Sequence, residues 1–215
     1  MLNYYQELSL LPQEEIPIHF LWPKVYQQIH LGLVEVQDDQ GRVPIGVSFP
    51  DYVVGEKYSL LGGKLRLFAQ DQATLAKFDA LRWLSRLSDY VHCTSIRPVP
   101  DKLKGYANYR RIQPITSKER LARRYAKRHN MDYGTALNSL VELSVKSVDG
   151  LGYEKKMLRY AELPNPTITL PFIRLKSLSG GGEFCLWIKK SVVTEPSGST
   201  YSSYGLSPIS TVPEF

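Results

Sequence analysis

Residues 64–96 read KLRLFAQDQATLAKFDALRWLSRLSDYVHCTSI, and this stretch decides the fold. Apolar and polar side chains alternate over 64–68, which predicts a short strand. Asp71 can then cap a helix at its amino end. The side chains expected on the buried side of this helix are Leu75, Phe78, Leu81, Trp83, Leu84 and Leu87. Residues 90–96 form a further strand before two prolines, so the stretch is predicted to be strand, helix, strand.

The residues before this stretch extend the same pattern. A strand is predicted over 3–10 and another over 45–49. Between them, Val25, Ile29 and Leu33 recur at helical spacing, so a helix is expected with its main run after Pro23. The order strand, helix, strand, strand, helix, strand predicts a ferredoxin-like βαββαβ domain over 1–97 in an α+β chain. Because this fold has many functions, function must come from the site.

The second half of the chain is predicted to form a smaller α+β domain. Residues 98–116 are polar and basic and are interpreted as a linker. The domain at 117–215 is expected to contain an arginine-rich helix at 117–130 and a β-hairpin at 167–190, with a glycine-rich tip. Further helices are expected at 133–145 and 153–163. The tail after 196 is rich in Ser, Tyr, Gly and Pro, but it has apolar side chains with which to pack.

Positive charge is concentrated in one segment. The chain carries a formal net charge of +6, with a sequence pI near 9.2. Residues 101–130 contain ten basic and two acidic residues, a net charge of +8, which leaves −2 for the rest. The basic residues are Lys102, Lys104, Arg110, Arg111, Lys118, Arg120, Arg123, Arg124, Lys127 and Arg128. A mildly acidic body with one dense basic segment is typical of a polyanion-binding protein, although a solvated helix face is the alternative.

Half of these cations are predicted to share one face of the helix at 117–130. They recur at i, i+3, i+4, i+7 and i+8, namely Arg120, Arg123, Arg124, Lys127 and Arg128. Residues 116–119, TSKE, fit a capping box at the start of the helix. Guanidinium groups form forked hydrogen bonds with phosphate oxygens, so this stripe favours a phosphate backbone as its ligand.

Several classes of protein are disfavoured. The longest apolar runs are only a few residues long, far from the roughly 20 needed to cross a membrane, and the first residues lack the features of a secretion signal. Cys93 and Cys185 form no CxxC pair, which argues against structural zinc or a disulfide framework. There is no Walker A motif, GxGxxG motif or HExxH motif. We therefore expect a cytoplasmic protein without a metal or cofactor.

His30 is the candidate catalytic residue. It follows Ile29 near the end of the first long helix, at the edge of the apolar face. Histidine is well suited to proton transfer near neutral pH. RNA supplies its own nucleophile, the ribose 2′-OH, so a base and good alignment suffice to cleave it. The alternative is a histidine with a purely structural role at an interface.

Six segments of the chain are informative when they are taken together. In chain order they are IHLGLV at 29–34, IGVSFP at 45–50, YRRIQ at 109–113, ERLARRYAKRH at 119–129, LPFIRLKSLSGGGEF at 170–184 and SYGLS at 203–207. Together they resemble one family, the CRISPR-associated endoribonucleases that cut precursor CRISPR RNA, and specifically the type I-F, Csy-type branch of the Cas-six family. They follow the order of the family over nearly the whole chain.

The resemblance implies a role for each matching residue. His30 would transfer the proton, Ser177 would hold the 2′-OH, and Tyr204 would position His30. The residues implied to bind RNA are Arg111 and Gln113 at purine edges, Phe184 stacked on the terminal base pair, Ser179 in the hairpin, and the cations Arg120, Arg123, Arg124, Lys127 and Arg128 on phosphates. Purely structural roles remain open for three of these residues. Ser177 is also consistent with an outward-facing strand residue, Tyr204 with a packing residue and Phe184 with a core residue.

The resemblance also implies an activity. It is metal-independent cleavage of the CRISPR repeat hairpin at its 3′ base, leaving a 2′,3′-cyclic phosphate and a 5′-hydroxyl. The protein would then stay on the mature RNA as a subunit of the type I-F surveillance complex, with no small-molecule ligand and no membrane partner. The alternatives are a non-cleaving RNA-binding subunit and a DNA-binding regulator.

The chain departs from the family pattern in two places. Lys127 stands where arginine is typical, which keeps the attraction to phosphate but loses the forked geometry. Residues 131–166 are longer than in compact members of the family and add the basic residues Lys155, Lys156 and Arg159. This segment is expected to contact RNA or a partner subunit.

Overall fold

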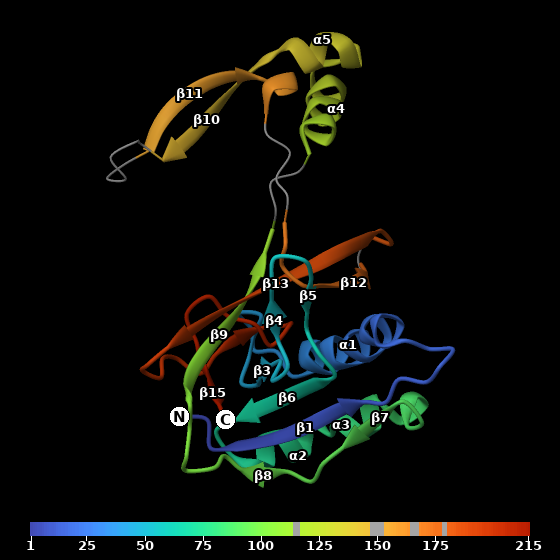
Figure 1. Ribbon diagram of the computed structural model, residues 1–215, viewed down its shortest axis with the longest axis vertical. Coiled ribbons are helices and arrows are strands. Elements are labelled where there is room, and N and C mark those ends of the chain that lie inside the picture. The colour runs from blue at the N-terminus through green and yellow to red at the C-terminus, as the bar shows by residue number, and fades with distance from the viewer. Residues whose placement is uncertain (114–116, 147–152, 164–167, 178–179) are drawn as a thin grey trace. The chain divides into compact units, whose positions relative to one another are not determined.

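The computed structural model describes residues 1–113, 117–146, 153–163, 168–177 and 180–215 (Figure 1). The chain forms two compact units. Unit 1 contains residues 1–113 and 169–215, and unit 2 contains residues 114–168. This division differs from the expected one, because the hairpin predicted at 167–190 belongs to unit 1. The structure is mixed α and β, with antiparallel sheets and helices.

The first sheet of unit 1 has the strand order β3-β6-β1-β7, and β8 also pairs with β1. The strands are β1 (Tyr4–Leu10), β3 (Gly46–Ser48), β6 (Lys64–Ala69), β7 (Val91–Cys93) and β8 (Arg97–Pro98). All of these pairings are antiparallel. Alternate residues of β1 and β6, such as Leu8, Leu65 and Leu67, are buried in the core. The four predicted strands of the first domain are therefore present.

Helix α1 (Ile18–Glu35) packs on strand β12 (Phe172–Lys176), which belongs to a second sheet, and on α3 (Ala80–Trp83). It begins before Pro23, which lies inside the helix. Its buried side consists of Leu21, Trp22, Val25, Tyr26, Ile29, Gly32 and Leu33. The helix therefore buries one stripe completely and leaves His30 at the edge of that stripe.

The helix predicted after Asp71 is interrupted. Asp71 caps α2 (Gln72–Phe78) by accepting a hydrogen bond from the Thr74 amide. Asp79 then adopts a left-handed conformation with φ of 49°, and α3 and the 3₁₀ turn η1 (Ser85–Leu87) follow. Because the break rotates the later residues, Leu81 is 60% exposed and is not part of the core as predicted.

Gly32 allows α1 to approach α3 closely. A Cβ atom at this position would lie 2.6 Å from Trp83 Nε1 and 2.8 Å from Phe78 Cε2. Overpacking of this kind costs about 1–3 kcal/mol, more than the roughly 0.5–1 kcal/mol that alanine gains over glycine within a helix.

We expect Gly32→Ala to lower the free energy of unfolding by about 1–2 kcal/mol in a urea titration. Gly182→Ala is the control, since nothing lies within 4 Å of the Cβ position there. Equal stability of Gly32→Ala and the wild type would show that the α1–α3 contact is not tight.

The second sheet of unit 1 has the order β12-β13-β9-β15 and is antiparallel. The strands are β9 (Gly105–Ile112), β12 (Phe172–Lys176), β13 (Glu183–Val193) and β15 (Val212–Glu214). Strand β9 occupies the middle of the segment interpreted as a linker over 98–116. Ala107 and Tyr109 are buried, while Arg110 and other polar side chains point to the opposite face. Because of these polar side chains, the sequence of a central strand was interpreted as a linker.

Two pairs of short antiparallel strands stabilise the loops and the C-terminal tail of unit 1. Strand β14 (Tyr201–Ser202) pairs with β2 (Arg42–Val43), and β4 (Val53–Val54) pairs with β5 (Ser59–Leu60). Tyr201 and Leu206 are buried in the core, as expected for the tail. The tail is therefore an integral part of unit 1.

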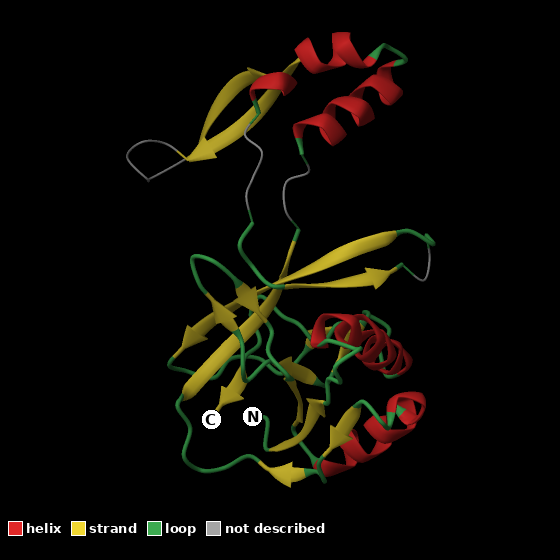
Figure 2. Ribbon diagram, turned by 45° about the vertical axis from the view of Figure 1, so that its right-hand side comes forward, coloured by secondary structure: helices red, strands yellow, loops and turns green. Residues whose placement is uncertain are grey.

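Unit 2 consists of helices packed at one end of a two-stranded sheet (Figure 2). Its elements are α4 (Lys118–His129), α5 (Tyr133–Asn138), β10 (Leu140–Lys146), β11 (Tyr153–Arg159) and η2 (Tyr160–Glu162). The predicted helix at 133–145 is thus half strand, and the predicted helix at 153–163 is mostly strand. Val141 and Val145 are β-branched and favour strands. Antiparallel pairing of β10 with β11 satisfies the backbone hydrogen bonds along their facing edges.

Candidate active site

Four predicted site residues meet in unit 1. The rings of His30 and Tyr204 stack with centroids 4.2 Å apart and planes 7° apart. Phe184 contacts the Tyr204 ring edge-on, at 6.4 Å between centroids. The guanidinium of Arg111 lies 5.2 Å from the centroid of the Phe184 ring and 5.4 Å from that of Tyr204. Helix α1, strands β9 and β13, and the tail each contribute to this group, which we call the ring cluster (His30, Arg111, Phe184, Tyr204).

A backbone carbonyl fixes the protonation pattern of His30. Its Nδ1 lies 2.8 Å from the carbonyl oxygen of Ser203. Because a carbonyl oxygen can only accept a hydrogen bond, Nδ1 carries the hydrogen. In the neutral ring the lone pair is then on Nε2. His30 can therefore take up a proton at Nε2 while Nδ1 and the stacked Tyr204 ring hold it in place.

The surroundings of His30 favour the neutral ring. Burial lowers the pKa of His30 below its usual value of 6.5, and the positive charge of Arg111 lowers it further, while the hydrogen bond to Ser203 opposes the shift. Half-burial is the largest of these causes. At neutral pH the Nε2 lone pair is available, which is the state that a general base requires.

We expect His30 to titrate with a midpoint below 6.5 in an NMR titration of its imidazole resonances. Arg111→Ala should move that midpoint upward, because a nearby positive charge that disfavours the imidazolium is removed. The folded protein should also lose the stability contributed by the neutral ring as the pH falls through this lowered pKa. A midpoint at or above 6.5 would contradict the proposed role of burial.

The turn that carries Ser203 and Tyr204 is held from two sides. The Tyr26 hydroxyl donates a hydrogen bond to the Tyr204 carbonyl at 2.7 Å, and the Val47 amide donates to the Gly205 carbonyl at 3.0 Å. Gly205 has φ of +66°, and a Cβ there would lie 2.5 Å from Val47 Cγ1, so only glycine fits. These contacts position both the carbonyl and the ring that contact His30.

Ser177 directly follows β12 at the hairpin turn. Its Oγ accepts a hydrogen bond from the Gly180 amide at 3.1 Å, and its amide donates to the Gly182 carbonyl at 2.7 Å. The hydroxyl hydrogen is therefore free to donate elsewhere. Among the described contacts, Ser177 makes no hydrogen bond to His30. The neighbouring candidate Ser179 lies outside the described residues.

Unit 2 presents the predicted cationic stripe. All five of its side chains are exposed: Arg120, Arg123, Arg124, Lys127 and Arg128. The opposite side of α4 is buried through Ala122 and Ala126. The Ser117 side chain caps the helix by accepting from the Arg120 amide. Within the described part of the chain none of the five forms a salt bridge, so their charges are available to an anionic ligand.

Not all of the predicted site residues lie in the ring cluster. Within unit 1, Arg111 belongs to the ring cluster, whereas Gln113 is exposed just after the end of β9. Sequence reasoning missed two contributors, the Ser203 carbonyl and Tyr26. Tyr26 precedes His30 by one helical turn, and this spacing was the available signal for it. A backbone carbonyl gives no signal in residue types.

In the described ranges, no three His, Cys, Asp or Glu side chains gather where they could hold a metal ion. Both cysteines are free, and burial raises the pKa of Cys93 to about 11. No helix among the described residues is long and apolar enough to cross a membrane.

Comparison with known proteins identifies the family. A family model described as CRISPR-associated protein (Cas_Csy4) matches residues 5–215. The chain belongs to this family. The CRISPR-associated endonuclease Cas6/Csy4 of Escherichia coli (strain UTI89 / UPEC) is 31% identical over 215 residues, covering 100% of both chains. The protein of the same name from Pseudomonas aeruginosa (strain UCBPP-PA14) is 30% identical over 217 residues, again covering 100% of both.

These matches confirm the family resemblance drawn from the six segments. A solved structure described as "An RAMP protein binding different RNA substrates" aligns over 99% of this chain and 100% of the other, with 9% identity and a TM-score of 0.32. A score this low supports no inference about the fold.

Proposed function

We propose that this protein is a metal-independent endoribonuclease that binds the CRISPR repeat hairpin and cleaves precursor CRISPR RNA at its 3′ base. The observation that carries the proposal is the ring cluster, in which His30 stacks on Tyr204 and uses Nδ1 to contact the Ser203 carbonyl, which leaves Nε2 for proton transfer. The two relatives named as CRISPR-associated endonucleases support it. The substrate class follows from the family to which the chain belongs.

The reaction uses the ribose 2′-OH as nucleophile. His30 Nε2 accepts the 2′-OH proton, and O2′ attacks the adjacent phosphorus. The O2′–P bond forms, the P–O5′ bond breaks, and the proton taken up by His30 Nε2 is returned to the departing O5′. The products are a 2′,3′-cyclic phosphate and a 5′-hydroxyl, so no water and no metal need take part. Alignment of the attacking oxygen can supply about 7–11 kcal/mol of the barrier reduction.

Ser177 and Tyr204 position the reacting groups. The Ser177 Oγ accepts from one backbone amide, so its O–H hydrogen and a remaining lone pair can bind the 2′-OH. Tyr204 stacks on the His30 imidazole and so holds the orientation of its ring. Both roles are positioning roles, and each is supported by the backbone hydrogen bonds that fix the two turns.

The proposed RNA contacts fall into two groups, those to the phosphates of the RNA backbone and those to its bases. The exposed cations of α4 contact phosphates, with Arg123 and Arg124 forming forked hydrogen bonds. In unit 1, Arg111 and Gln113 contact purine edges, and the half-buried Phe184 stacks on the terminal base pair. Ser179 is proposed as a further RNA contact, as implied by the family resemblance. Specificity then comes from stem shape and the base of the stem.

Two finer assignments complete the proposal. The first sheet is proposed to be ferredoxin-like, and its antiparallel order β3-β6-β1-β7 with intervening helices supports this. The cytoplasmic protein would remain on the mature RNA as a subunit of the type I-F surveillance complex. Residues 131–166, which carry the exposed Lys155 and Lys156, would contact RNA or a partner subunit there.

One incubation tests the function. A radiolabelled repeat hairpin is mixed with the protein in excess chelator, with duplex DNA as competitor. Cleavage at the 3′ base with cyclic phosphate ends supports the proposal. Binding without cleavage would instead indicate an assembly subunit, and preference for duplex DNA would indicate a regulator.

A further inference from the structure

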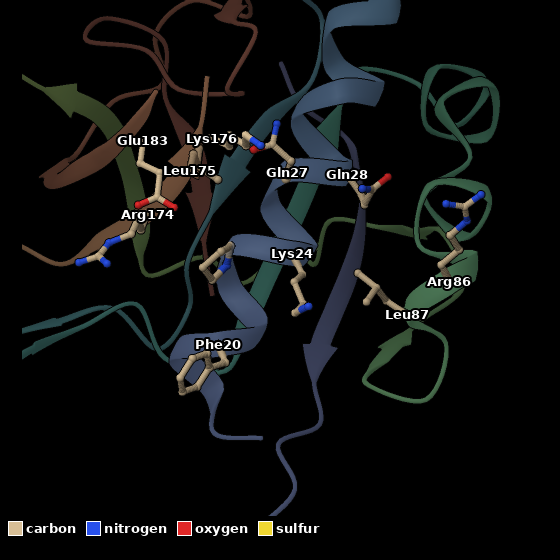
Figure 3. Close-up of a pocket in the computed structure, with 11 residues that line it drawn as sticks. Phe20, Lys24, Gln27, Gln28, Arg86, Leu87, Arg174, Leu175, Lys176 and Glu183 are labelled. Atoms are coloured by element: carbon tan, nitrogen blue, oxygen red, sulfur yellow. The ribbon is translucent and has the colours of Figure 1, made fainter. Parts of the chain in front are cut away.

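A groove runs along α1 between Phe20, near the start of the helix, and Gln28 (Figure 3). It has a volume of about 540 Å³ and lies entirely within unit 1. Helix α1 forms one wall, and η1 and the β12–β13 hairpin form the others. Its lining includes Phe20, Lys24, Gln27, Arg86, Arg174 and Lys176.

The charges of the groove favour an anionic ligand. Four cations line it, Lys24, Arg86, Arg174 and Lys176, against one carboxylate, Glu183. All four are exposed, and none forms a salt bridge with another residue that the structure describes. Four separated charges along an open groove suit a chain of phosphates better than a single anion.

The other side chains favour a nucleic acid over a simple polyanion. Phe20 is 59% exposed, and its ring is available for stacking. Gln27 also lines the groove, and its Nε2 is buried without a hydrogen-bond partner among the described residues. An exposed aromatic ring beside a cationic wall is the combination that binds single-stranded nucleic acid.

One end of the groove is lined by residues that neighbour the proposed site residues in sequence, because Gln27 precedes His30 by three positions and Glu183 directly precedes Phe184. Phe20, Lys24, Gln27 and His30 are spaced three or four residues apart, so they lie along one face of α1. Ten residues of helix span about 15 Å, room for a few nucleotides. On the opposite wall Lys176 directly precedes Ser177.

We propose that this groove binds the single-stranded RNA that continues on the 3′ side of the scissile phosphate. The inference rests on the proposed function, which puts the base of the hairpin at the ring cluster. Gln27, three residues before His30, and Lys176, next to Ser177, line one end of the groove, whereas Phe20 near the start of α1 lines the other end (Figure 3). The strand that leaves the hairpin past the cut therefore enters the groove.

The test compares three hairpins that carry a 2′-deoxyribose just 5′ of the scissile phosphate, which stops cleavage. One ends at that phosphate, one has a short single-stranded 3′ extension, and one has the same extension at its 5′ end. The dissociation constants are measured for the wild type, for Lys24→Ala/Arg86→Ala, and for the control Lys77→Ala/Arg97→Ala. The control removes the same charges from exposed positions of unit 1 outside the groove.

In the wild type the 3′ extension should tighten binding by roughly tenfold, the sum of a few exposed charge contacts. The groove variant should lose most of that gain and bind the unextended hairpin normally, whereas the control should keep it. The salt dependence of the gain should fall by about 0.7 per lost phosphate contact.

Two outcomes would overturn the groove assignment: no gain from the 3′ extension in the wild type, or a gain that the groove variant fully keeps. A gain from the 5′ extension alone would assign the groove to the other flank and would also contradict it. Failure of the proposed function is separate, because an all-ribose hairpin would then remain uncut in the same preparation.

Discussion

A His30→Ala protein is expected to bind the repeat hairpin within a few-fold of wild-type affinity and to leave it uncut. The imidazole is the only group of the ring cluster that can exchange a proton near neutral pH, and its Nε2 is the free nitrogen. General acid–base catalysis by one side chain contributes about 10²–10⁴-fold in rate. Single-turnover cleavage and a filter-binding isotherm on the same RNA separate rate from affinity.

The control for this variant is His92→Ala. His92 is exposed on β7, outside the ring cluster, so its loss should change neither cleavage nor binding. A His30→Ala protein that cleaves at the wild-type rate would remove His30 from the mechanism. The Ser203 carbonyl and Tyr204 would then have only structural roles.

The second prediction with a large expected effect concerns the affinity of the protein for the repeat hairpin. Replacing Arg123 and Arg124 together by alanine is expected to weaken hairpin binding by several kcal/mol, since each charge-assisted contact contributes about 1.5–3 kcal/mol. Both side chains are exposed on α4, so the loss of stability should be small. The slope of log affinity against log salt should also flatten by about 0.7–0.9 for each lost phosphate contact.

The Lys77→Ala/Arg97→Ala protein is the matched control, because it removes two exposed cations from unit 1. If nonspecific attraction dominated, both double variants would bind equally weakly. At saturating RNA the Arg123→Ala/Arg124→Ala protein should still cleave, since the ring cluster is intact. A variant with unchanged affinity and salt slope would mean that the stripe does not contact phosphates.

Local patterns predicted the elements of the first sheet well. The alternation in 64–68 and the cap at Asp71 are properties of neighbouring residues, and the structure has both. Strand β9 was missed because its core side chains alternate with polar ones that resemble a linker. Its partners β13 and β15 are distant in sequence. The division into units depends on this pairing, so it could not be predicted from local composition.

The geometry of the candidate site also could not be predicted from local sequence patterns. His30 and Ser203 are separated by 173 positions, and no periodicity connects them. The family resemblance gave the residue types, and the structure then brought His30, Arg111, Phe184 and Tyr204 together. The contact of Arg111 with two rings was not predicted, because the family pattern assigned that side chain to a base. The strands β10 and β11 were missed because each was interpreted alone as a helix.

The central claim is that the RNA supplies the nucleophile and the protein aligns it. The most direct measurement is the single-turnover cleavage rate of two hairpins in excess chelator, identical except for one 2′-deoxyribose just 5′ of the scissile phosphate. The proposal predicts that both bind equally, that the ribose hairpin is cut to a 2′,3′-cyclic phosphate, and that the deoxy hairpin stays intact. Cleavage of the deoxy hairpin at the ribose rate would make water the nucleophile and contradict the roles of His30, Ser177 and Tyr204.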